Sequence, residues 1–201
     1  MEKTLEQHLL AERHAAYARL RGGFPIPLSG AIYWFTLAGL GLFTDLYTWS
    51  LLAFVGSGLI FPSAVGLAAL FGNRFLADRT AVTGVLLPTF IGMLLFWPMA
   101  IAALWEATDL VPLILAIGLS MHWPVIGWSY GRTALFASHA IARAAVVFVI
   151  WLFLDEARTT LLPLSVGLIY LATTIAILID SDRFRRREAA AGTPARAAGD
   201  A

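Results

Sequence analysis

Three basic side chains stand inside long apolar segments of this chain, where a charge or a ring nitrogen could bind an anion or carry a proton. Arg143 lies ten residues into segment 133–154, and His139 precedes it by four residues, which puts both on one face of a helix. An arginine at the centre of a membrane helix costs about 2.5–3.5 kcal/mol on insertion scales. We therefore expect this face to look into a helix bundle and to have polar neighbours there.

His122 extends this group to the preceding segment, 110–130, which runs in the opposite direction. At a rise of about 1.5 Å per residue, the two imidazoles have depths within about 3 Å of each other. Hydroxyl and aromatic side chains at similar depth complete a predicted pocket on the cytoplasmic side of the bundle. The predicted ligand-binding residues are Arg143, His139, His122, Trp128, Tyr130, Trp123 and Tyr170.

The same basic residues also have a structural interpretation. Intramembrane histidines often join helices through hydrogen bonds to carbonyl or hydroxyl groups. Arg143 could likewise bond to carbonyls at a helix end or to Asp180, although Asp180 is expected about 15 Å from the membrane centre. Both interpretations stay open for His122 and for the pair of His139 and Arg143.

Long apolar runs dominate the rest of the sequence, which is 59% hydrophobic and 13% charged. About 20 helical residues cross a hydrocarbon core of about 30 Å, and runs that are apolar on every face favour helices over barrel strands. The sequence therefore predicts an all-α, polytopic bundle of six transmembrane helices. The predicted spans are 25–43, 46–71, 80–104, 110–130, 133–154 and 160–180.

Basic residues predict the orientation of these spans, because cytoplasmic loops carry an excess of Lys and Arg. Twelve Lys and Arg residues fall on one side of the predicted spans and Arg158 alone falls on the other. Trp49, Trp105 and Trp151 lie at the opposite ends, where an aromatic belt is expected. Both termini are therefore predicted to be cytoplasmic, and the dominance of Arg over Lys points to a bacterial inner membrane.

The two ends of the chain differ from its middle. Residues 1–23 predict an amphipathic helix, either on the membrane surface or as a cap over the cytoplasmic loops, before the 24–180 transmembrane domain. Residues 181–201 form a basic tail that we expect to be largely disordered, above all after Glu188. Its arginines could bind anionic lipid or act as a stop-transfer anchor. Gly39, Gly41, Gly56 and Gly58 offer small faces for a homodimer.

Several kinds of site are excluded or disfavoured. The chain has no cysteine, which rules out disulfides and thiolate metal sites. It carries none of the common hydrolase or phosphate-loop signatures, so no catalytic residue and no metal site are predicted. A net charge of +1 without a basic stripe argues against nucleic acid. A pair of histidines on facing helices leaves a b-type haem as a minor alternative, and the cofactor is otherwise unknown.

The prolines of two segments fall in related strings, Gly58 to Pro62 and Gly118 to Pro124, which is a pattern that transporter folds use to break helices near a binding site. The string His122-Trp123-Pro124-Val125-Ile126-Gly127-Trp128-Ser129-Tyr130 also resembles the motif of a bacterial family of small six-span membrane proteins catalogued as a domain of unknown function. The resemblance covers about residues 24–180, and its proline is shifted by one position. It implies six spans and groups His122, Trp128 and Tyr130, but no activity.

These observations lead to three hypotheses. The first is a membrane protein that binds, and could transport, a small polar or anionic ligand in the intrabundle pocket. The second is a structural or interaction module whose polar residues lock helices together. The third is a membrane redox protein with a b-type haem. The lipid bilayer is the expected partner in all three, and enzymatic activity is not predicted.

Overall fold

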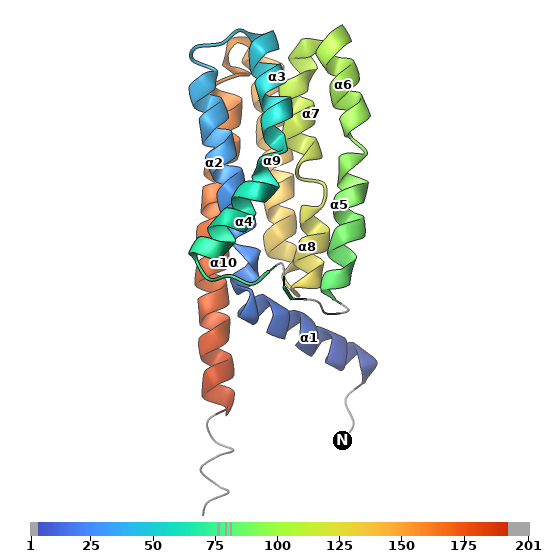
Figure 1. The fold of residues 1–201 in the computed structure, drawn as a ribbon, viewed down its shortest axis with the longest axis vertical. Coiled ribbons are helices and arrows are strands. Elements are labelled where there is room, and N and C mark those ends of the chain that lie inside the picture. The colour runs from blue at the N-terminus through green and yellow to red at the C-terminus, as the bar shows by residue number, and fades with distance from the viewer. Residues whose placement is uncertain (1–3, 76, 79, 81, 193–201) are drawn as a thin grey trace, which may run out of the picture.

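In the computed structural model the chain is a bundle of roughly parallel and antiparallel helices with one oblique helix at an end (Figure 1). The structure describes residues 4–192 except 76, 79 and 81, and these contain helices, turns and no strand. The predicted all-α class is therefore confirmed. The α-helices are α1 (Leu5–Arg19), α2 (Pro25–Leu40), α3 (Leu46–Ser57), α4 (Ile60–Leu70), α5 (Leu86–Leu94), α6 (Trp97–Glu106), α7 (Val111–Gly118), α8 (Trp123–Ser129), α9 (Thr133–Phe153) and α10 (Leu161–Gly192). Four 3₁₀ turns are described as well: η1 (Arg21–Gly23), η2 (Thr83–Val85), η3 (Thr108–Leu110) and η4 (Asp155–Ala157).

The long helix α10 packs along α2 on one side and along α9 on the other. Helix α9 in turn packs against α7 and α8, and α4 lies against α2. Helices α5 and α6 stand at the far side of the bundle from α10 (Figure 1). We call the end of the bundle that carries α1 the inner end, and the opposite end the outer end.

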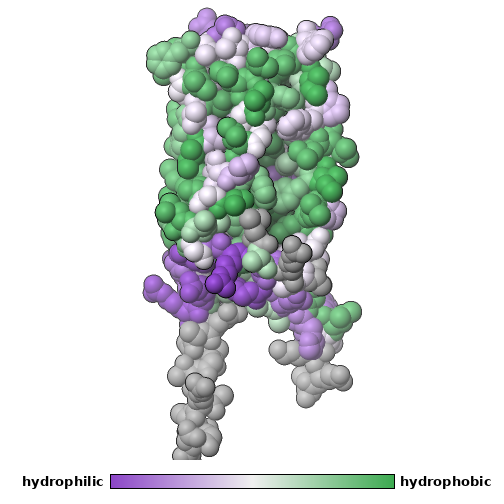
Figure 2. All heavy atoms as spheres, in the orientation of Figure 1, coloured by the Kyte–Doolittle hydropathy of each residue, from purple (hydrophilic) through white to green (hydrophobic). Residues whose placement is uncertain are grey.

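Four helical stretches of the described chain are long and apolar enough to cross a membrane: Thr83–Glu106, Thr108–Ser129, Thr133–Phe153 and Leu161–Arg187. The bent pair α3 and α4 makes a fifth when counted as one span. Figure 2 shows apolar side chains over most of the bundle surface and a hydrophilic band at its inner end. The helices thus fit a multi-pass membrane protein. The first predicted span corresponds to α2, which has 16 residues and rises about 24 Å.

Three of the apolar segments are broken near their middle rather than continuous. The breaks lie at Gly58 and Leu59, between α3 and α4, at Leu95 and Phe96, between α5 and α6, and at Leu119–His122, between α7 and α8. The chain tightens to 3₁₀-type bonds there, since Leu59 N donates to Gly56 O at 2.9 Å, Phe96 N to Met93 O at 3.2 Å and Trp123 N to Ser120 O at 3.1 Å.

A proline follows each break and explains its position. Pro62, Pro98 and Pro124 stand in the first turn of α4, α6 and α8. Proline has no N–H and its ring clashes with the preceding turn, so it is tolerated at a helix start but not in a helix interior. The sequence pattern pointed to Pro62 and Pro124, whereas the break before Pro98 was not predicted.

Helix α1 begins with a capping box, in which Gln7 N donates to Thr4 Oγ1 and Thr4 N donates to Gln7 Oε1. Its second half packs under the bundle, where Tyr17 is fully buried and its hydroxyl donates to Asp180 Oδ2 at 2.8 Å. Its first turns are exposed, including Leu5 and Leu9. These contacts support the cap among the two predicted alternatives, and binding of the exposed half to a membrane surface stays a prediction.

The tail differs in part from its prediction, and the glycines bear on the predicted homodimer. Helix α10 continues through Gly192, so the backbone past residue 180 is helical where a largely disordered tail was expected. Residues 193–201 lie outside the described chain. Gly41 packs against the carbonyl of Thr159, whereas a Cβ at Gly39 would meet nothing within 4 Å. A homodimer therefore stays a prediction.

Candidate functional site

The three helix breaks meet at one cavity, which we call the central cleft. It has a volume of about 370 Å³ and is walled largely by aliphatic and aromatic side chains. Each break contributes residues to its lining: Ser57 and Gly58 from the first, Leu94 and Trp97 from the second, and Leu119 and His122 from the third. The cleft therefore lies at the level where α3, α5 and α7 end and α4, α6 and α8 begin.

Three residues that line the central cleft each carry a buried nitrogen without a hydrogen-bond partner in the described chain. The nitrogens are His122 Nδ1 and those of the indole N–H groups of Trp97 and Trp123. A buried polar group without a partner costs about 1–3 kcal/mol, so such groups are uncommon unless something else bonds to them. An indole N–H can only donate, whereas the role of His122 Nδ1 depends on the tautomer. No carboxylate stands among the described lining residues. The described lining thus carries buried donor groups and no negative charge.

His139 lies behind Trp123 as seen from the cleft. Its ring stacks on the Trp123 ring at a centroid distance of 4.0 Å and an interplanar angle of 20°. His139 Nδ1 is 2.8 Å from Thr173 Oγ1, whose own hydrogen is donated to Ile169 O. Nδ1 must then donate and carry the proton, which leaves Nε2 of the neutral ring as a buried acceptor without a partner. Trp123 contacts both imidazoles, since the His122 ring lies 6.1 Å from it by centroids.

Arg143 is fully buried inside the bundle, as its position on the face of His139 predicts. Its Nε donates to Ala116 O at 2.5 Å. In a continuous helix Ser120 N would donate to Ala116, but here it donates to Ile117 because α7 ends at this break. Arg143 therefore satisfies a helix-end carbonyl, which is one of the two structural alternatives.

The rest of the guanidinium has no hydrogen-bond partner in the described chain, because both Nη1 and Nη2 are buried and unpaired. The group lies over the rings of Trp34 and Tyr170 at 5.4 and 5.0 Å from their centroids. Asp180, the other structural alternative, does not reach it and instead pairs with Arg132 Nε at 2.8 Å. A buried cation with no carboxylate partner among the described residues thus stands behind the cleft.

Tyr170 is the partition between the central cleft and Arg143. Its ring lines the cleft and also lies against the guanidinium. Gly30 on α2 makes room for it, since a Cβ there would stand 2.5 Å from Tyr170 Cε1. Trp123 and His139 contact the ring edge-on. Tyr170 thus touches both the central cleft and the guanidinium of Arg143.

A second cavity of about 240 Å³, which we call the inner cavity, extends from the central cleft toward the inner end. The two cavities share five lining residues, namely Ile26, Phe61, Leu87, Phe90 and Trp123. The inner cavity reaches Gly22 and Gly23, whose positive φ angles of 62° and 65° turn the chain from α1 into α2. The two cavities are thus adjacent, one at the level of the helix breaks and the other nearer the inner end.

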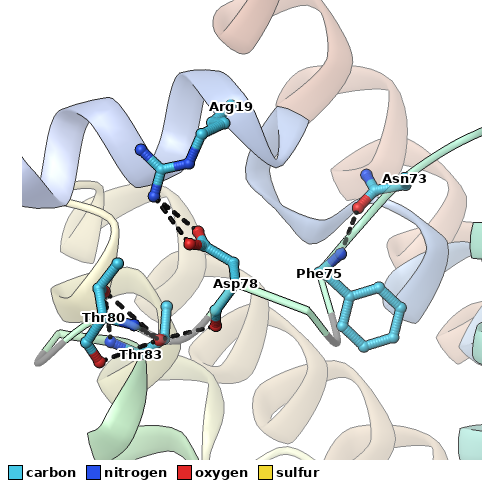
Figure 3. Close-up of polar contacts among 6 residues, drawn as sticks. All are labelled: Arg19, Asn73, Phe75, Asp78, Thr80 and Thr83. Carbon is cyan, nitrogen blue, oxygen red and sulfur yellow. Dashed lines mark hydrogen bonds and ion pairs between the residues drawn. The ribbon is translucent and has the colours of Figure 1, made fainter.

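Polar contacts join the described part of the connection between α4 and α5 to the end of α1 (Figure 3). Arg19 Nη2 on α1 contacts both carboxylate oxygens of Asp78, at 3.0 and 2.7 Å, and Asp78 lines the inner cavity. Asn73 Nδ2 donates to Leu20 O at 2.8 Å, while its Oδ1 accepts from Phe75 N at 3.0 Å. The described ion pair and amide contact thus hold the connecting segment to the end of α1.

Comparison with known proteins gives a match to one family. A family described as a family of unknown function (DUF7010) matches residues 9–180. The chain belongs to this family. Neither the curated proteins nor the solved structures give a match. The predicted resemblance to a family of unknown function is therefore confirmed, and the range shared with DUF7010 contains every predicted site residue. Bacterial origin and six spans stay predictions.

The predicted site residues of this DUF7010 member occupy four different positions. His122, Trp123 and Tyr170 line the central cleft, and Tyr130 lines the inner cavity. Arg143 and His139 lie behind the cleft, as described above. Trp128 is 41% exposed at the inner end, where Arg13 lies over its ring at 4.6 Å, so it lines neither cavity.

Sequence reasoning missed two polar residues of the central cleft in this DUF7010 member, Ser57 and Trp97. Trp97 directly precedes Pro98, and a proline inside an apolar run is the signal that could have indicated a break and a site there. Ser57 precedes Gly58, at the start of the string that the pattern of prolines had already singled out.

Proposed function

We propose that this member of the family is a six-span protein of a bacterial inner membrane with both termini in the cytoplasm. Helix α2, the first along the chain, would bring the number of spans from five to six, since it packs along the full-length span α10. An even number of spans puts both termini on one side, and both α1 and the end of α10 extend from the inner end (Figure 1). The excess of Arg and Lys at that end supports a cytoplasmic side.

The second part of the proposal is that the protein binds a small molecule in the central cleft. The observation that carries it is the convergence of three helix breaks on one cavity in which His122 Nδ1 is buried and unpaired. The apolar walls fit an apolar body, and the unpaired indole N–H groups fit acceptor atoms such as those of a carboxylate or a carbonyl. Arg143 favours a negative charge, because no described carboxylate neutralises it.

Transport of this ligand is a natural extension of binding. Transporters build midplane sites from discontinuous helices, whose exposed ends and flanking side chains bind the substrate. The inner cavity supplies a path toward the proposed cytoplasmic side, and the pair of Arg19 and Asp78 supplies its closure. The substrate would be a small anionic or acceptor-bearing molecule with an apolar part.

Native mass spectrometry of the purified protein tests the binding proposal. The wild type is expected to retain a small molecule that His122→Phe loses, because phenylalanine fills the same space without a ring nitrogen. His8→Phe is the matched control, since His8 is exposed on α1. Retention of the same added mass by both variants, or by neither the wild type nor the control, would contradict the proposal.

A structural module without a ligand is the second candidate, and the bond of Arg143 to Ala116 O favours it. Other interhelical bonds act in the same way, such as Ser29 Oγ to Ile60 O at 2.7 Å. Arg143→Leu separates the two candidates. A purely structural role predicts a lower melting temperature in detergent and an unchanged mass spectrum, whereas the ligand proposal predicts loss of the bound mass.

The haem alternative has a specific observation against it. Two histidines that share a haem must direct one nitrogen each to the same iron from opposite faces of the porphyrin. Here the Trp123 ring stacks on the His139 imidazole at a centroid distance of 4.0 Å, and His139 Nε2 is buried. We therefore expect an absorbance spectrum of the purified protein without a Soret band.

A further inference from the structure

A groove between α9 and α10 opens at the inner end of the bundle, away from the central cleft. It has a volume of about 510 Å³, and we call it the α9–α10 groove. Arg132 and Arg183 stand on its lining together with the carboxylate of Asp180. Leu135, Ala176 and Ile179 form its apolar part. Nothing in the proposed ligand path uses this groove.

The depth of the groove follows from helix geometry. Helix α9 has 21 residues and so rises about 30 Å from Thr133 to Phe153, which equals the usual hydrocarbon thickness. Arg132 precedes it directly. On α10, Arg183 follows Leu161 by 22 residues, or about 33 Å. Both arginines therefore stand at the same boundary of the bilayer, where phospholipid headgroups lie.

The charges of the groove are unbalanced toward the positive. Arg132 Nε pairs with Asp180 Oδ2 at 2.8 Å, and Tyr17 donates to the same carboxylate oxygen. The Arg132 guanidinium is also held over the rings of Tyr17 and Phe184, at 5.2 and 4.9 Å. Arg183 is exposed and forms none of the ion pairs of the described chain. One fixed and one unpaired arginine against one carboxylate leave a single positive charge.

We propose that the α9–α10 groove binds a monoanionic phospholipid. Its phosphate would lie between Arg132 and Arg183, since guanidinium groups bind phosphate oxygens in a directed, often bidentate way. Its acyl chains would extend over Leu135, Ala176 and Ile179 toward the hydrocarbon. The single positive charge matches one headgroup, and the apolar side of the groove distinguishes a lipid from free phosphate.

The test uses the full chain in nanodiscs of phosphatidylcholine with one-fifth phosphatidylglycerol, and native mass spectrometry measures the lipids retained on release. The wild type is expected to retain phosphatidylglycerol preferentially. Arg183→Gln should lower that preference about fivefold, which corresponds to the loss of one arginine near an anionic surface. Because Arg183 has no described ion-pair partner, this variant should fold as the wild type does. Arg187→Gln, one turn further along α10, is the matched control and should retain the preference.

Three results would overturn the proposal. Equal losses in Arg183→Gln and Arg187→Gln would mean that the tail attracts anionic lipid diffusely. Equal retention of phosphatidylcholine and phosphatidylglycerol by the wild type would show that the groove does not select lipids by headgroup charge. Displacement of the lipid by inorganic phosphate would mean a soluble anion site. The outcome is independent of the central cleft, because His122→Phe should keep the lipid while it loses the cleft ligand.

Discussion

Gly30→Ala tests the position of Tyr170, on which the separation of Arg143 from the central cleft depends. The new Cβ would stand 2.5 Å from Tyr170 Cε1 and 2.8 Å from its Cζ. Carbon atoms in contact prefer about 3.5–4.0 Å, so the ring must move by roughly 1 Å or more. Tyr170 is 4% exposed and is enclosed by Trp123, His139 and Arg143. Its free direction is therefore the cleft.

The expected change in the free energy of unfolding has two opposing parts. Overpacking of a well-filled interior costs about 1–3 kcal/mol. Replacement of glycine by alanine in a helix interior returns about 1 kcal/mol. Gly30→Ala should then destabilise the protein by up to about 2 kcal/mol. Gly39→Ala is a control in the same helix α2, because its Cβ would meet nothing within 4 Å, and it should stabilise the protein slightly.

Unfolding of both variants by sodium dodecyl sulfate in bicelles, followed by circular dichroism, measures this difference. We expect Gly39→Ala to be the more stable of the two by about 1–3 kcal/mol. We also expect Gly30→Ala to bind the cleft ligand less tightly, since the displaced ring occupies part of the cavity. Equal stability of the two variants would refute the reasoning, because Tyr170 would then not be held against Gly30.

Two further predictions concern the inner end. In a protein with a single cysteine introduced as Ser57→Cys, Arg19→Ala or Asp78→Asn should raise labelling of that cysteine by a membrane-impermeant maleimide added at the inner side. The charge exchange of Arg19→Asp with Asp78→Arg should restore protection. Unchanged labelling would show that this ion pair does not close the path. Burial and the hydrogen bond to Asp180 raise the pKa of the Tyr17 hydroxyl above its ordinary value. The stability that the protonated hydroxyl contributes is therefore complete below about pH 10 and is lost as the pH rises through the raised pKa. Melting temperatures from about pH 8 to about pH 11 should therefore fall more steeply for the wild type than for Tyr17→Phe, and parallel curves would count against this assignment.

Much of the fold could be predicted from the sequence because the lipid environment makes a strong demand on it. Backbone groups in hydrocarbon must be satisfied within the segment, so long apolar runs predict helices directly. The four-residue spacing of His139 and Arg143 likewise predicts one shared face, and both are buried in the bundle. The antiparallel connection of their helix to that of His122 brings the three residues to one region around Trp123 and Tyr170.

The features that the sequence did not predict, such as the break before Pro98 and the docking of α1, depend on contacts between residues far apart in the chain. A local sequence pattern does not contain such contacts. The helix containing Trp97 looks continuous because an apolar run hides its break, so its place on the cleft was missed. The docking of α1 rests on single side chains such as Arg13, which donates to Trp128 O, and Arg19, which pairs with Asp78. Charged residues near a membrane are also expected as topology signals, so their presence in the sequence does not indicate a specific partner.

The common level of the three helix breaks has a mechanical consequence. Helices α4, α5 and α8, of 11, 9 and 7 residues, all lie on the inner side of that level, whereas α2, α9 and α10 pass it without interruption. Each of these three short helices is joined through its break to a helix on the outer side, α4 to α3, α5 to α6 and α8 to α7, and all three lie beside the continuous helices α2, α9 and α10. Amide hydrogen exchange should therefore be faster at the three breaks than along the uninterrupted middle of α9 and α10, which would make the level of the central cleft the least rigid part of the bundle interior.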